Sequence, residues 1–177
     1  SVVPAAEALA AQFPAEPDVA ILLATLYGQQ HRYREAESTL RRALEAHPRD
    51  MDLLNNWSLI LTQAKDVASV EAVIRRMIEA EPKSMDHRLR LARFYIEQGS
   101  YSKAEAVLRD AVALAPEDEE RRMVLAEYFV HRKDNASAER VLLEVEAAIH
   151  HGLRRHGVTG ESGHGVVAAV VGVINRF

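Results

Sequence analysis

Apolar residues recur along the first 150 residues in a pattern typical of paired helices. In each of four stretches a large apolar residue is followed directly by a small one, and three residues later by a tyrosine, phenylalanine or leucine. These positions are Leu23, Ala24 and Tyr27; Trp57, Ser58 and Leu61; Leu91, Ala92 and Tyr95; and Leu125, Ala126 and Phe129. A second set follows each: Ala36, Leu40 and Ala43; Val70, Ile74 and Met77; Ala104, Leu108 and Ala111; and Ala138, Leu142 and Val145. Spacings of three and four place such side chains on one face of a helix, so the pattern predicts two helices per stretch.

Prolines divide the chain at a constant interval, called here the repeat interval. The prolines at this interval are Pro14, Pro48, Pro82 and Pro116, and the repeat interval is the number of residues from each one to the next. Proline interrupts helices because it lacks an amide hydrogen. Residues suited to N-caps follow three of these prolines: Asp50, Ser84 and Asp118 stand where each new first helix is expected to begin.

We therefore predict an all-α fold of repeats, in which neither helix of a pair can bury its apolar face alone and successive pairs stack into a solenoid. The predicted parts are the second helix of a truncated repeat at 1–16, repeats at 17–50, 51–84 and 85–118, a repeat with a degenerate end at 119–150, and at 151–177 a linker rich in glycine and histidine with a short apolar segment.

The third repeat resembles the tetratricopeptide repeat (TPR). Its matching positions are Leu91, Ala92, Tyr95, Gly99, Tyr101, Ala104, Leu108, Ala111 and Pro116. The first repeat is similar, the second departs from the pattern at Lys65 and Val70, and the fourth has His150 where proline is usual. The resemblance extends to about residue 149 and implies a right-handed superhelix of antiparallel helix pairs, whose first helices line a concave groove.

The resemblance also implies which residues line that groove. They are Thr25, Gln29, Asn55, Asn56, Leu59, Gln63, Arg90, Arg93, Glu97, Glu127 and His131. Some TPR domains hold a peptide's terminal carboxylate with a clamp of lysines, asparagines and an arginine. Asn56 and Arg90 occupy two of those positions, but Ile21, Thr25 and Asp86 replace other members, so the complete clamp is not expected.

Arg90 and Arg93 allow two interpretations. Their guanidinium groups suit bidentate contact to a carboxylate, or contact to backbone carbonyls of a bound peptide. In the alternative, both arginines pair with Asp86, Glu97 or Glu127 in water.

Charge and composition exclude several classes of function. A net charge of −4 argues against nucleic-acid binding, and Glu37, Glu71 and Glu105 each precede an arginine by four residues, which predicts ordinary pairs within a helix. The chain has no cysteine, and we predict no catalytic group, metal or cofactor. The apolar run 166–174 is about half the length of a membrane-spanning helix. Trp57 is predicted to pack in the core.

We therefore predict a non-catalytic scaffold that binds a partner protein or peptide in the concave groove. The alternative is an accessory domain of a larger enzyme or cell-envelope assembly machine. Because residues 1–16 are predicted to be only the second helix of a truncated repeat, we expect a piece of a larger TPR protein. The excess of arginine over lysine suggests a bacterial source, so we expect the cytoplasm or the periplasmic side of an envelope lipoprotein. The segment 166–174 is expected to pack onto the open end of the array or into a groove, its own or that of a second copy, which would cause self-association.

Overall fold

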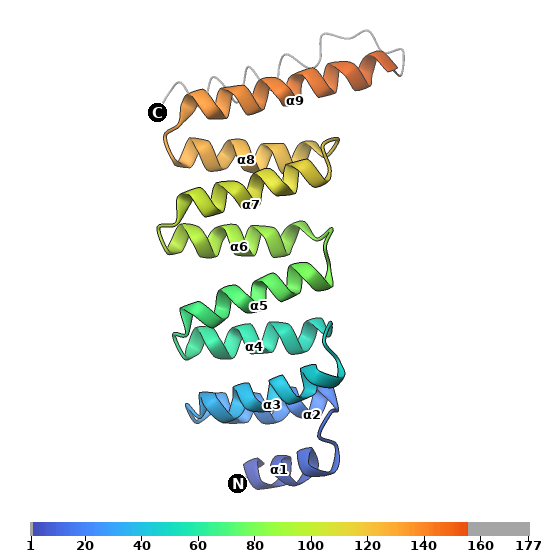
Figure 1. Cartoon of the computed structure of the whole chain (residues 1–177), viewed down its shortest axis with the longest axis vertical. Coiled ribbons are helices and arrows are strands. Elements are labelled where there is room, and N and C mark those ends of the chain that lie inside the picture. The colour runs from blue at the N-terminus through green and yellow to red at the C-terminus, as the bar shows by residue number, and fades with distance from the viewer. Residues whose placement is uncertain (1, 156–177) are drawn as a thin grey trace. The chain divides into compact units, whose positions relative to one another are not determined.

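The computed structural model describes residues 2–155, and all regular structure in this range is α-helical (Figure 1). The helices are α1 (Val2–Gln12), α2 (Pro17–Gln29), α3 (Tyr33–Ala46), α4 (Met51–Gln63), α5 (Val67–Ala80), α6 (Met85–Glu97), α7 (Tyr101–Leu114), α8 (Glu119–His131) and α9 (Asn135–Arg155). The predicted all-α helical-repeat solenoid is confirmed.

Aspartates begin several of the helices. The side chain of Asp50 accepts a hydrogen bond from the Leu53 amide at 2.9 Å, and that of Asp118 accepts one from the Arg121 amide, as the sequence predicts. The second helices α5 and α9 have the same device at Asp66 and Asp134, which the sequence analysis did not identify. Side-chain caps therefore satisfy amides that would otherwise lack a partner at both kinds of helix start.

The turn inside each repeat has one backbone conformation. Its central residue is left-handed, with φ of 60° at His31, 58° at Lys65, 68° at Gly99 and 59° at Lys133, and these positions recur at the repeat interval. In each turn the amide of the following residue donates back to a carbonyl of the preceding helix, as Asp66 does to Leu61. Only the third repeat has the glycine that this conformation favours. Lys65 thus departs from the family pattern in side chain but not in backbone shape.

The chain divides into two compact units, with the boundary inside α6 between Phe94 and Tyr95. In the first unit α2 contacts α1, α3 and α4, and α4 contacts α3 and α5. Its core includes fully buried leucines and other apolar residues at Leu40, Leu53, Leu54, Ile74 and Met77. Trp57 is 9% exposed, so its predicted burial is confirmed.

The second unit is built around α8, which packs against α7 and α9. Its core contains Tyr95, Leu108, Leu125, Phe129 and Leu142. Tyr128 anchors α8 to the start of α7, because its hydroxyl donates to the Tyr101 carbonyl at 2.8 Å.

The last helix is longer than the sequence predicts. α9 continues to Arg155, five residues into the range 151–177 that was predicted to be a linker. His150 stands where the other repeats have proline, so nothing in the sequence interrupts the helix there. The apolar segment 166–174, and with it the predicted self-association, lies outside the described residues. None of the described helices is long and apolar enough to cross a membrane.

Candidate functional site

Eight of the eleven predicted groove residues lie in the first unit, on three first helices. Thr25 and Gln29 are on α2; Asn55, Asn56, Leu59 and Gln63 are on α4; Arg90 and Arg93 are on α6. Helices α2 and α4 are in direct contact, and an arginine of α6 bonds to α4. We call these eight residues the polar strip. All of them are at least partly exposed, and Leu59 exposes 52% of its surface.

Two members of the polar strip already use a donor inside their own helices. The Thr25 hydroxyl donates to the Ile21 carbonyl, and Asn56 Nδ2 donates to the Asp52 carbonyl, both at 2.8 Å. Each side chain still has oxygen lone pairs, because a hydroxyl and an amide oxygen can accept further bonds. Toward a ligand, Thr25 is therefore an acceptor, whereas Asn56 can accept through its oxygen and donate its second amide hydrogen.

Arg90 is the most constrained residue of the polar strip. Its Nη1 donates to Asn55 Oδ1 at 3.0 Å, and its Nη2 donates to Ser58 Oγ at 2.9 Å. Ser58 is 1% exposed, so the guanidinium reaches into the boundary between α4 and α6. Burial lowers the pKa of Arg90, but an arginine remains protonated.

The partners of Arg90 are neutral. Within the described residues of the first unit no carboxylate lies within ion-pair distance of it, and the predicted alternative pairing with Asp86 is not formed. The site thus holds a partly desolvated positive charge that is fixed by neutral groups, with no carboxylate of the first unit's described residues within ion-pair distance. Such a charge favours an anionic or strongly dipolar ligand.

The other three predicted groove residues belong to the second unit. Glu97 ends α6, and Glu127 and His131 lie on α8; all three are exposed. No group of three or more histidine, aspartate or glutamate side chains suited to holding a metal occurs in the part of the chain that the structure describes.

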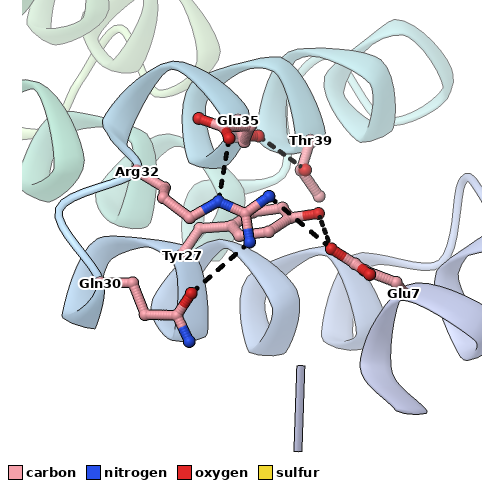
Figure 2. A network of polar contacts seen from close by, with 6 residues as sticks. All are labelled: Glu7, Tyr27, Gln30, Arg32, Glu35 and Thr39. Carbon is pink, nitrogen blue, oxygen red and sulfur yellow. Dashed lines mark hydrogen bonds and ion pairs between the residues drawn. The ribbon is translucent and has the colours of Figure 1, made fainter. Parts of the chain in front are cut away.

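A polar network that the sequence analysis missed joins α1, α2 and α3 (Figure 2). Tyr27 donates its hydroxyl to Glu7 Oε1 at 2.7 Å, and the Arg32 guanidinium lies 4.3 Å from the centre of the Tyr27 ring. Arg32 Nε donates to Glu35 Oε1 at 2.9 Å, and Arg32 Nη2 lies 3.8 Å from Glu7 Oε1. Burial and the bond to Glu7 raise the pKa of Tyr27, and the bond from Arg32 lowers the pKa of Glu35. The sequence feature that could have predicted this network is Tyr27 itself, because it lies among the buried apolar positions of its helix and a buried tyrosine hydroxyl needs a hydrogen-bond partner.

A cavity of about 320 Å³ lies beside this network. Its walls come from α1 and α3 and its floor from α2; the lining includes Glu7, Ala11, Leu23, Tyr27, Thr39 and Arg42. We call it the leading groove. The leading groove lies between α1 and α3, which occupy the second-helix positions of their repeats, and none of its lining residues belongs to the polar strip.

Comparison with protein families decides the classification. Two models, each described as tetratricopeptide repeat, match residues 21–84 and 61–128, and together they cover more than half of the chain. The chain belongs to the tetratricopeptide repeat family. A search of curated protein sequences finds no match.

Solved structures of TPR proteins have the same fold. The crystal structure of MamA has a TM-score of 0.55 at 10% identity, covering 86% of this chain and 89% of MamA. YrrB, a TPR protein with an unusual peptide-binding site, has a TM-score of 0.52 at 14% identity, covering 97% of this chain and 82% of YrrB. A chain of the Naa15/Naa10 complex bound to HypK-THB has a TM-score of 0.59 at 19% identity, covering 82% of this chain and 22% of that chain. At these identities the likeness establishes the fold alone.

The family assignment settles the class of function at a coarse level. TPR repeats are protein-interaction modules and are generally non-catalytic, so this TPR protein is a protein-interaction scaffold. The mode of binding depends on the individual residues that the scaffold presents.

Proposed function

We propose that this TPR protein binds an extended segment of a partner protein along the polar strip, with Arg90 as its anchor. The observation that carries this proposal is the fixed guanidinium of Arg90, which Asn55 and Ser58 hold at 3.0 and 2.9 Å and which forms no ion pair among the described residues of the first unit. A side chain that is already immobilised loses little conformational entropy when a ligand binds.

The chemistry of the strip suits a peptide main chain. Arginine has five N–H donors, and the hydrogen bonds of Arg90 to Asn55, Ser58 and the Met77 sulfur leave two for a carboxylate or carbonyl of the ligand. Arg93 is exposed and makes no ion pair or hydrogen bond among the described residues, so it can add a second cationic contact. The exposed side chain of Leu59 offers apolar contact between the polar groups.

A peptide as the ligand class is also supported by YrrB, which has this fold and a peptide-binding site. The likeness to YrrB concerns the fold, so the argument for the position of the ligand rests on Arg90 and its neighbours. An acidic side chain or a terminal carboxylate of the peptide is expected beside Arg90.

The test uses a library of random 12-residue peptides displayed on phage, selected against the full chain. Selected peptides are synthesised with a fluorophore, and their binding is measured by anisotropy. Arg90→Met keeps an unbranched apolar stem and should weaken binding about 10-fold or more, because a charge-assisted hydrogen bond is lost. Arg93→Glu should weaken it further by repulsion.

Arg34→Glu is the matched control, because Arg34 is an exposed arginine on α3, outside the strip. It should leave the affinity within about twofold. Circular dichroism checks that each variant retains its helices. If selected peptides bind Arg90→Met and Arg93→Glu as well as the parent chain, the polar strip is not the binding surface.

A further inference from the structure

We propose that the leading groove is a second docking site, which receives an aromatic side chain, above all tryptophan, from a partner protein. The site is separate from the polar strip, because it lies between the second-helix positions α1 and α3 over the floor formed by α2. The proposal rests on what the chain itself does with the equivalent space one repeat later.

That equivalent space, between α3 and α5 over α4, is called here the second groove. Leu23 of the leading groove corresponds to Trp57, Glu7 to Arg41, and Arg42 to Arg76, each pair being separated by the repeat interval. Both arginines lie near the indole of Trp57: the Arg41 Cζ is 6.0 Å and the Arg76 Cζ 5.4 Å from the centre of its ring. A groove of this design therefore accepts an indole and buries all but 9% of the residue.

The leading groove has the same design without the indole. Leu23 is shorter than tryptophan, and the wall residues Ala10 and Ala11 are smaller than Leu44 and Glu45, their equivalents one repeat later. The result is the cavity of about 320 Å³. This volume is at the small end of ligand pockets, which fits one large side chain better than a cofactor.

The charged groups at the leading groove also fit an incoming indole. Arg42 makes no hydrogen bond or ion pair among the described residues, so its guanidinium is available to stack on a ring, as Arg76 does on Trp57. Glu7 lines the other wall; its Oε1 accepts the Tyr27 hydroxyl (Figure 2). Its Oε2 makes no hydrogen bond or ion pair among the described residues. That oxygen can accept the N–H of an indole.

This acceptor distinguishes the two grooves. In the second groove the residue equivalent to Glu7 is Arg41, which has no acceptor, and the buried Nε1 of Trp57 has no hydrogen-bond partner among the residues that the structure describes. An indole in the leading groove would satisfy its N–H and still meet a guanidinium. The same acceptor favours tryptophan over phenylalanine, and the carboxylates of Glu7 and Glu35 disfavour an anionic ligand.

The experiment titrates the ¹⁵N-labelled full chain with N-acetyl-tryptophanamide and follows backbone amide shifts. Saturable shifts are expected at α1 and α3, around Ala11 and Thr39, with a Kd on the order of 0.1–1 mM for a ligand of this size. N-acetyl-phenylalaninamide and the 1-methyl-indole derivative, which lack the N–H donor, should bind about 5- to 10-fold more weakly.

Three variants test the position of the site. Leu23→Trp supplies the indole from within, as in the second groove, and should abolish the shifts. Arg42→Ala should weaken binding several-fold through the lost cation–π contact, whereas Arg34→Ala on the same helix should not. Leu23→Ala keeps the groove open and should retain the shifts if Leu23→Trp proves poorly folded by circular dichroism.

The outcomes are separable from those of the proposed peptide binding. Arg90→Met should leave the tryptophanamide shifts unchanged, because Arg90 does not line the leading groove. The inference is overturned by an absence of saturable shifts, by shifts that persist in folded Leu23→Trp, or by shifts confined to α4 and the start of α6.

Discussion

The leading groove and the second groove are built from equivalent helices, but the first contains a cavity and the second is filled by a tryptophan side chain. In each, two second-helix positions enclose a space over a first helix, and their residues correspond at the repeat interval. The second groove is closed by Trp57, and the leading groove is open to about 320 Å³ above Leu23. Leu23 and Trp57 are both buried, at 5% and 9% exposed, so the two grooves differ in how much of the neighbouring volume the side chain fills and not in whether this position faces the core.

The comparison also separates two roles of arginine. Arg76 lies against an indole that is already present and supports the core. Arg42 holds the same position in its repeat, but with Leu23 rather than tryptophan beside it. Equivalent residues in a repeat protein therefore need not share a function, because their neighbours come from two other helices.

Removing the Trp57 side chain, which fills the second groove, should have the largest effect on the stability of the fold. Trp57→Ala is expected to lower the free energy of unfolding by about 3–5 kcal/mol, through lost burial and a cavity that the helices do not close. Trp57 is the chain's single tryptophan, so the variant has no tryptophan fluorescence, and urea unfolding is therefore followed by circular dichroism. Trp57→Leu reproduces the residue of the leading groove and should cost less. A loss below about 1 kcal/mol in Trp57→Ala would contradict the burial of the indole.

The network beside the leading groove has no counterpart at the second groove, where Leu61 replaces Tyr27. Tyr27→Phe should therefore cost about 1.5 kcal/mol, because the Glu7 carboxylate loses its hydroxyl donor. The pKa of Tyr27 is raised in the folded state, so above about pH 10 the unfolded chain releases this proton first and stability falls as pH rises further. Urea midpoints across the alkaline range should fall less steeply for Tyr27→Phe than for the parent chain. Parallel slopes would refute the assignment.

A tryptophan at position 23 should fill the leading groove in the way that Trp57 fills the second groove. Leu23→Trp should raise the free energy of unfolding by about 1 kcal/mol, because the added apolar surface enters existing space. The same substitution in a closed core would instead cost about 1–3 kcal/mol by overpacking. Urea unfolding of Leu23→Trp beside Trp57→Leu tests the pair directly, and a loss of stability in Leu23→Trp would show that the groove does not admit an indole.

Sequence reasoning reached the features that depend on one helix or on the repeat interval. The burial of Trp57, the cap at Asp50 and the pair of Glu105 with Arg109, which lie 2.8 Å apart, all follow from local spacing. The bonds of Arg90 to Ser58 and of Tyr27 to Glu7 join residues 32 and 20 positions apart. Such contacts depend on how neighbouring helices are set against each other, which periodicity alone does not specify.

The open state of the leading groove was beyond sequence reasoning for a related reason. A leucine at position 23 satisfies the repeat pattern as well as a tryptophan does at position 57. Whether the space above it is filled depends on the small alanines of α1 and on the side chains of α3. The pattern identifies that a side chain faces the core, but not how much of the volume it occupies.

The smallest expected effect concerns the turns, where repeats share a backbone but differ in residue. Lys65 has φ of 58° and Gly99 has φ of 68°, and a side chain added at Gly99 would meet nothing within 4 Å. The cost of a side chain here is therefore conformational. Lys65→Gly should raise the free energy of unfolding by roughly 0.5 kcal/mol, since relief of the left-handed strain exceeds the added entropy of the unfolded chain. Gly99→Ala should lower it by about 1 kcal/mol. Thermal unfolding of the two single variants measures both, and changes of equal sign would show that the turns are not equivalent.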